Sequence, residues 1–338
     1  MIPCIDVAPL LGPAGVARDA VDAAIMAAAA DSGFMTIRGF DAAVATDRAA
    51  RAAVLRIFTL SDAGKRRLYR RKFDPARPNV YRGWFPLQFG ERTHKEGIDI
   101  GPDLVRPIAV ADDPLRELTP LPDEAELPGW RASAAAYYRG MESLGLVLMR
   151  AIARGLGLPE TRFDAPFADG ISTLRLIHYP SRRPESLVGI PDVITEDGRH
   201  ITGAAHVDSG LVTLLAQDGV PGLQARARDG TWIDVPPAEG TLAINFGKLL
   251  ERWSGGRIRA TEHRVVGTGA DRCSIPFFFE PAVDAVIAPL PLPGIEGFEP
   301  FAYGDHLWAA MMRFVEFRGL EHARPPTGVN ADHARVHP

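Results

Sequence analysis

Cysteine and net charge are both scarce in this sequence. Its 338 residues contain two cysteines, Cys4 and Cys273, which lie far apart in the chain and do not suggest a disulfide framework. The 38 Lys and Arg residues nearly balance the 42 Asp and Glu residues, which gives a formal net charge of −4. No strong field would therefore draw the whole protein to nucleic acid or to an anionic membrane, and small molecules are the expected partners. The sequence does not indicate an oligomeric state.

Long apolar runs are missing as well. The N-terminus lacks a positively charged start before an apolar run, and the Ala-rich stretch at residues 22–30 is too short for a membrane span and favours an amphipathic helix. We find no internal repeat. Since 46% of the residues are hydrophobic, a chain of this length can bury a large core. A cytoplasmic enzyme is the expectation.

Helical patterns dominate the first half of the chain and strand patterns the second. The apolar period and a capping signal at Ser61 predict helices over residues 16–30, 42–58, 60–65 and 129–154. Residues 72–119 have many Pro, Gly and charged residues with little period, which predicts a long ordered loop region. A final helix is expected over residues 301–319. Short runs separated by Gly, Pro and Asp predict strands over residues 171–179, 201–206, 211–217, 223–227, 231–235, 241–246, 258–266 and 274–279. This series favours a mainly β fold with flanking helices, a sandwich or jelly roll whose two sheets enclose a pocket.

Three side chains in the second half form a metal-binding pattern. On a strand end, the period of two places His206 and Asp208 on the same face. His263 follows in a β-branched run suited to a buried strand, which the fold can bring alongside. Two imidazoles and one carboxylate are the ligand set of a mononuclear non-haem iron site with open positions. The sequence therefore predicts an Fe(II) site at His206, Asp208 and His263, with oxygen chemistry.

An anion-binding pair lies shortly after the third ligand. Arg272 and Ser274 share one face of a strand, and a guanidinium with a neighbouring hydroxyl is suited to hold a carboxylate through charge-assisted hydrogen bonds. We therefore expect a metal and a carboxylate clamp in one site.

The ordered set of motifs resembles the isopenicillin N synthase-like family of iron(II)- and 2-oxoglutarate-dependent oxygenases. The resemblance covers nearly the whole chain. Besides the metal and Arg-x-Ser residues, it rests on residues 2–6 (IPCID), 31–37 (DSGFMTI), 81–84 (YRGW), 178–180 (HYP) and 221–224 (PGLQ).

The resemblance implies a cupin-like double-stranded β-helix. A helical or mixed N-terminal region would span residues 1–160, the oxygenase domain residues 161–320 and a mobile tail residues 321–338. It also implies an enzyme that uses Fe(II), O2 and 2-oxoglutarate, with the distal carboxylate of 2-oxoglutarate held by Arg272 and Ser274. Such an enzyme hydroxylates, desaturates or cyclises a small molecule, here an amino acid, a peptide or a secondary metabolite.

Two further residues on the strand at 171–179 are candidates for ligand contacts. Arg175 and Tyr179 share one face of this strand. The resemblance implies that Tyr179 can reach the co-substrate or substrate, although a ring that ends a strand in the core explains it equally well. Arg175 would meet an acidic group of the substrate if it points into the cavity, and the other interpretation is a solvent-facing arginine.

Other functions fit the same residues. The Arg-x-Ser pair does not prove 2-oxoglutarate, because isopenicillin N synthase carries it and applies it to its peptide substrate. An oxidase that uses O2 without 2-oxoglutarate therefore stays open, as does a protein that binds a metal or a small acid without catalysis. A zinc hydrolase is disfavoured, since such sites usually take three histidines or two histidines and a glutamate.

Overall fold

The computed structural model describes residues 1–41, 44, 47–88, 94–109, 112–182, 194–196 and 198–327. In chain order its strands are β1 (Cys4–Asp6), β2 (Phe34–Arg38), β3 (Gly83–Phe85), β4 (Glu96–Ile100), β5 (Thr173–Tyr179), β6 (Ile194–Glu196), β7 (Arg199–His206), β8 (Val212–Gln217), β9 (Leu223–Arg226), β10 (Trp232–Asp234), β11 (Leu242–Phe246), β12 (His263–Val266), β13 (Arg272–Phe279), β14 (Val286–Ile287) and β15 (Phe301–Ala302). Its α-helices are α1 (Val16–Asp31), α2 (Arg48–Leu55), α3 (Asp62–Arg67), α4 (Trp130–Gly155), α5 (Asp164–Phe167), α6 (Lys248–Trp253) and α7 (Tyr303–Met311).

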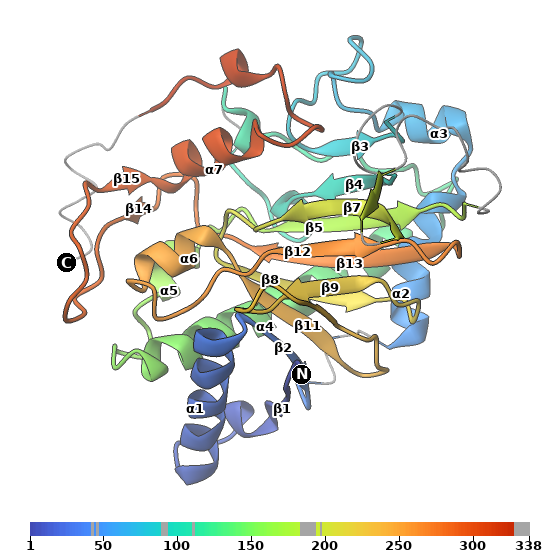
Figure 1. Cartoon of the computed structure of the whole chain (residues 1–338). Helices are drawn as coiled ribbons and strands as arrows, with labels where there is room; N and C mark the ends of the chain where they lie inside the picture. The colour runs from blue at the N-terminus through green and yellow to red at the C-terminus, as the bar shows by residue number, and fades with distance from the viewer. Residues whose placement is uncertain are drawn as a thin grey trace.

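Two stacked β-sheets form the centre of the molecule, with helices outside them (Figure 1). The larger sheet has the strand order β1-β2-β11-β8-β13-β5-β4-β3, and the smaller one β10-β9-β12-β7-β6. A short β14-β15 pair precedes α7. This mainly β architecture with flanking helices is the fold class that the sequence predicts.

Helix α4 packs across the outer face of the large sheet. Its contact with β13 is close, because a Cβ added at Gly145 would lie 2.6 Å from the Phe279 ring. Helix α1 packs in turn on α4, and Arg154 makes two hydrogen bonds to Asp22 at 2.6 and 2.7 Å across this contact. The helices thus bury the apolar outer face of the sheet and leave its inner face for the site.

The region predicted as a loop at residues 72–119 contains two strands, so that prediction is wrong. Strands β3 and β4 pair with each other, and β4 pairs with β5 as part of the large sheet. All five residues of β4 are buried, and two of them, Glu96 and Asp99, are acidic. Their cationic partners Lys65, Arg70 and Arg175 lie outside β4. The sequence of β4 alone therefore contains acidic residues without visible partners, and it is not apolar enough to predict a buried strand.

Several predicted elements are shorter than expected. Helix α2 begins at Arg48 because the Asp47 side chain accepts hydrogen bonds from the amides of Ala49 and Ala50. The strand predicted over residues 258–266 is limited to β12, and the helix predicted over residues 301–319 begins as strand β15 and ends with α7 at Met311.

The predicted domain boundaries stay a prediction, although strands β1 to β4 lie in the same sheet as β5, β8, β11 and β13. In the predicted tail, Arg324 is buried and pairs with Asp113 and Asp305, while residues 328–338 lie outside the described residues. Within the described ranges, no helix is long and apolar enough to cross a membrane. The cytoplasmic location stays a prediction.

Candidate active site

The three predicted metal ligands lie together at the end of the small sheet. His206 ends β7, His263 begins β12, and the two residues are register partners. Asp208 follows two residues after β7. Its Oδ1 atom lies 3.6 Å from His206 Nε2 and 3.7 Å from His263 Nε2. One ligand atom from each residue lies within 4.8 Å of the others, and no other such cluster occurs in the described part of the chain.

Backbone carbonyl groups orient the two imidazole rings. His206 Nδ1 lies 2.8 Å from the oxygen of Ala204, and His263 Nδ1 lies 3.1 Å from the oxygen of Thr261. Since a carbonyl oxygen only accepts, each Nδ1 carries the proton and donates it. Each Nε2 therefore presents its lone pair to the space beside Asp208, which is the arrangement of metal-bound histidines in proteins.

The Asp208 carboxylate is oriented by two donors. Its Oδ2 atom accepts hydrogen bonds from Thr213 Oγ1 at 2.6 Å and from Asn245 Nδ2 at 2.7 Å. Thr213 and Asn245 are cross-strand partners on β8 and β11 of the large sheet. The other oxygen, Oδ1, is left facing the two imidazoles. The large sheet therefore fixes the carboxylate that completes the candidate metal site on the small sheet.

The protonation states suit a cation. Burial, with a further contribution from the neighbouring His263, lowers the pKa of His206 to about 4. Burial raises the pKa of Asp208, but His263, His206 and the two hydrogen-bond donors outweigh it, so the net pKa is lowered. Neutral imidazoles and an ionised carboxylate are the forms that bind a divalent metal ion. The donor set thus fits Fe(II), as the sequence predicts.

A cavity of about 380 Å³ opens beside the three ligands and is lined by both sheets. Arg272 and Ser274, both buried, lie in its wall on β13. Arg272 Nε donates to the Val220 carbonyl at 3.3 Å. Its Nη1 and Nη2 atoms are buried and have no hydrogen-bond partner within the described residues. Leaving the donors of a buried guanidinium unpaired costs free energy, and a ligand carboxylate would accept hydrogen bonds from both nitrogens at once.

The other two candidates also line the cavity. Tyr179 is the register partner of Arg272, and its ring centroid lies 5.0 Å from the Arg272 guanidinium carbon. Arg175 borders the cavity and does not face solvent. Its Nε and Nη2 atoms both donate to the Asp99 carboxylate. All seven residues predicted for the site therefore border one cavity.

Several residues at the site are not evident from the sequence. Thr213 and Asn245 donate hydrogen bonds to Asp208. The asparagine inside the buried strand Leu242–Phe246 is a weak sequence signal, because pocket lining and packing would each explain it. Lys95 and Glu316 form an ion pair at 3.1 Å in the cavity wall. No sequence signal joins these two, because they lie in distant parts of the chain.

Comparison with known proteins places this geometry in a family. Residues 171–281 match the model of the 2OG-Fe(II) oxygenase superfamily. An isopenicillin N synthase of Streptomyces clavuligerus is 33% identical, over 94% of this chain and 97% of the relative's own length. A proline hydroxylase of Petromyces alliaceus is also 33% identical, over 65% of this chain and 70% of the relative's own length. The crystal structure of a full-length Neurospora crassa protein in complex with alpha-KG superposes with a TM-score of 0.78 and 25% identity, over 92% of this chain and 96% of that one. These relatives also confirm the jelly-roll fold. The chain therefore belongs to the isopenicillin N synthase-like family of 2OG-Fe(II) oxygenases, and it is an oxygenase that uses Fe(II), 2-oxoglutarate and O2.

Proposed function

We propose that His206, Asp208 and His263 hold the iron of this oxygenase and that Arg272 and Ser274 hold the distal carboxylate of 2-oxoglutarate. The observation that carries the proposal is the pair of unpaired, buried guanidinium nitrogens of Arg272 in the same cavity as the metal ligands. When bound together, Fe(II), 2-oxoglutarate and O2 couple decarboxylation of the co-substrate to oxidation of a substrate.

The protein residues bind and orient the reactants and exclude water. Arg272 offers two parallel donors, which match the two oxygens of a carboxylate. The Tyr179 ring lies against the guanidinium and limits its movement by a cation–π contact. Around the metal ligands, apolar side chains such as Leu211 and Phe314 line the cavity, and they keep the reacting groups away from bulk water.

The substrate is a small molecule. The cavity volume of about 380 Å³ lies near the lower end of the roughly 300–1,000 Å³ typical of ligand sites, and the co-substrate takes part of it. The relatives act on compounds of this scale, since one is a proline hydroxylase and the Neurospora crassa protein was crystallised with thymine. We infer that Arg175 contacts the substrate, because it borders the cavity away from Arg272.

Succinate formation tests the proposal. Anaerobically purified, Fe(II)-loaded protein should form succinate slowly from 2-oxoglutarate in air, and faster when a substrate is present. His206→Ala and Arg272→Met proteins should not. Arg226→Met is a matched control, because Arg226 lies exposed on β9 of the small sheet and pairs with Glu262. Full succinate formation by Arg272→Met would contradict the role of this arginine.

A second candidate is a further reaction of the same site, which uses O2 without 2-oxoglutarate. It is favoured by the 33% identity to isopenicillin N synthase over 94% of the chain. Arg272 and Ser274 would then hold a carboxylate of the substrate itself. Uptake of O2 that depends on a substrate but not on 2-oxoglutarate, in protein with Fe(II) bound, would support this candidate over the first.

A further inference from the structure

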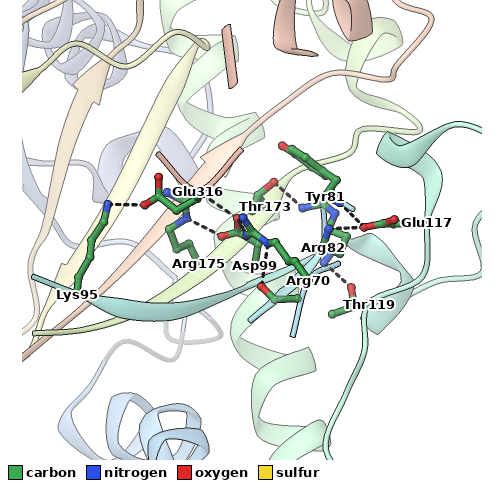
Figure 2. Close-up of polar contacts among 12 residues, drawn as sticks. Arg70, Tyr81, Arg82, Lys95, Asp99, Glu117, Thr119, Thr173, Arg175 and Glu316 are labelled. Atoms are coloured by element: carbon green, nitrogen blue, oxygen red, sulfur yellow. Dashed lines mark hydrogen bonds and ion pairs between the residues drawn. The ribbon is translucent and has the colours of Figure 1, made fainter. Parts of the chain in front are cut away.

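A buried cluster of charged residues surrounds Arg175 at one side of the cavity. Figure 2 shows the Asp99 carboxylate between two guanidinium groups, those of Arg175 and Arg70. Arg175 donates to Asp99 through Nε at 2.5 Å and Nη2 at 2.8 Å, and Arg70 donates through Nη2. The third nitrogen of Arg175, Nη1, has no hydrogen-bond partner within the described residues. Arg175 is thus a cavity residue with two donor nitrogens fixed and one available.

Two aromatic rings lie beside the same guanidinium. The ring centroids of Phe85 and Phe278 both lie 5.4 Å from the guanidinium carbon of Arg175. An arginine with a bidentate partner and two neighbouring rings has little rotamer freedom left to lose when a ligand binds. The available nitrogen is therefore held in place before any ligand arrives.

The cluster carries more positive than negative charge. Arg70, Arg175 and Lys95 are the cations, and Asp99 and Glu316 are the anions that pair with them. One positive charge is therefore left without a counter-ion among the residues that the structure describes. Arg70 shows the imbalance directly, because it is fully buried, its Nη1 has no partner, and burial lowers its pKa despite the contact with Asp99.

The neighbouring charged residues do not remove this surplus. Arg82 lies beside Asp99 and adds another cation, while the Glu117 carboxylate accepts hydrogen bonds from backbone amides that include the amide of Arg82. Burial raises the pKa of Glu280 to about 7, so this carboxyl is only partly ionised near neutral pH. The cavity side of the cluster therefore still lacks a negative charge.

This cluster is distinct from the Arg272 clamp. Arg272 pairs in register with Tyr179, and Arg175 lies four residues earlier on the same face of β5. At a strand rise of about 3.3 Å per residue, four residues correspond to about 13 Å. One carboxylate cannot bridge this separation, so a ligand held by Arg272 leaves Arg175 available to a second anion.

We propose that the Arg70–Asp99–Arg175 triad forms a second anion site, which selects substrates that carry a carboxylate and disfavours neutral ones such as nucleobases. The proposal rests on the proposed function, because it assigns the Arg272 site to 2-oxoglutarate. Arg175 Nη1 donates to the substrate carboxylate, which supplies the missing negative charge. Asp99 is a positioning residue, since it acts through Arg175 and does not itself contact the substrate.

Calorimetric titration of the anaerobic Fe(II)–2-oxoglutarate complex tests the proposal without turnover. The probes are carboxylates and their matched amides, namely L-proline with L-prolinamide and benzoate with benzamide, and thymine as a neutral nucleobase. A hydrogen bond to a charged partner is worth about 1.5–3 kcal/mol, so each carboxylate should bind wild-type protein roughly ten- to a hundredfold more tightly than its amide. Arg175→Gln should abolish this preference, and Arg175→Lys should keep part of it.

Several results would overturn the inference. The first is that the amides or thymine bind wild-type protein as tightly as the carboxylates do. The second is that the Arg175→Gln protein keeps the preference for carboxylates. The third is that no carboxylate binds to a complex that does hold 2-oxoglutarate. The wild-type comparison needs no variant, so a folding defect in Arg175→Gln does not affect it. A wild-type protein that binds Fe(II) but not 2-oxoglutarate would contradict the proposed function instead. The same titrations on Fe(II)-loaded Arg272→Met protein, which lacks the first anion site, would then decide the second one.

Discussion

Removing the Thr213 hydroxyl should weaken iron binding without removing any proposed iron ligand. Thr213→Val keeps the shape of the side chain but deletes the 2.6 Å hydrogen bond to Asp208 Oδ2. Asp208 then keeps only the donor on Asn245. Loss of a hydrogen bond to a metal-binding carboxylate typically reduces metal affinity by about 10- to 100-fold. Because one of the two donors remains, we expect about tenfold, which corresponds to about 1.4 kcal/mol.

The double variant distinguishes orientation of the carboxylate from a simple loss of one contact. Asn245→Ala alone should lower the Fe(II) affinity by a similar factor, since it removes the other donor to the same oxygen. With both changes, Asp208 Oδ2 is buried without either donor, and the loss of affinity should exceed the product of the single losses. The pKa of Asp208 should also rise, so Fe(II) affinity should fall more steeply with decreasing pH than in wild-type protein.

Anaerobic calorimetric titration with Fe(II) measures the affinity, and circular dichroism of the metal-free proteins checks the fold. Thr231→Val is the matched control, because the Thr231 hydroxyl donates to Asp229 at 2.7 Å on the exposed surface. Fe(II) affinity of a folded Thr213→Val protein equal to that of wild type would refute the reasoning that these two donors set the metal affinity.

Three further predictions concern stability. Burial raises the pKa of Glu280 from 4.5 to about 7, so the folded protein favours its neutral form. This preference stabilises the fold by on the order of 3 kcal/mol below pH 4.5, and the contribution is lost as the pH rises through 7. Urea unfolding across this range should therefore show a decline that Glu280→Gln removes, and an unchanged decline would contradict this role. Lys95→Met leaves the buried Glu316 carboxylate without its closest cation, so the free energy of unfolding should fall by about 3 kcal/mol or more, and adding Glu316→Gln should restore part of it. Gly145→Ala places a Cβ 2.6 Å from the Phe279 ring and should cost about 1–3 kcal/mol, measured by thermal unfolding; a stability equal to wild type would show that α4 can move away from β13.

The positions of the proposed metal ligands and of the proposed carboxylate clamp were predictable because most of their signals are local. Two residues separated by one on a strand share a face whatever the rest of the fold does, and this holds for Arg272 with Ser274 on β13. His206 ends β7 and Asp208 lies two residues beyond it, and the two side chains still approach to 3.6 Å. The predicted strands that carry them are also present, with small changes at their ends. Local spacing and alternating patterns were therefore enough for the fold class and for the residues that border the cavity.

The charged cluster around Arg175 was not predictable for the opposite reason. Asp99 lies 76 residues from Arg175 in the sequence, and it is buried only because β4 pairs with β5. A strand with acidic residues in a region rich in Pro and Gly resembles a loop until its cationic partners are known. Long-range ion pairs of this kind depend on the complete fold, and the sequence pattern around either partner does not reveal the other.

The pairing of β5 with β13 links the two ends of the cavity. Arg175 and Tyr179 lie on one face of β5, and the partners of Tyr179 and Ile177 on β13 are Arg272 and Ser274. A register shift of one residue would turn Arg175 and Tyr179 out of the cavity together. The carboxylate clamp and the proposed substrate site therefore do not form independently, since the same strand pairing that places Tyr179 against Arg272 also sets the distance between the two anion sites. This fixed distance determines how far the group held by Arg175 lies from the co-substrate, and we expect it to restrict the length of acceptable substrates as much as their charge.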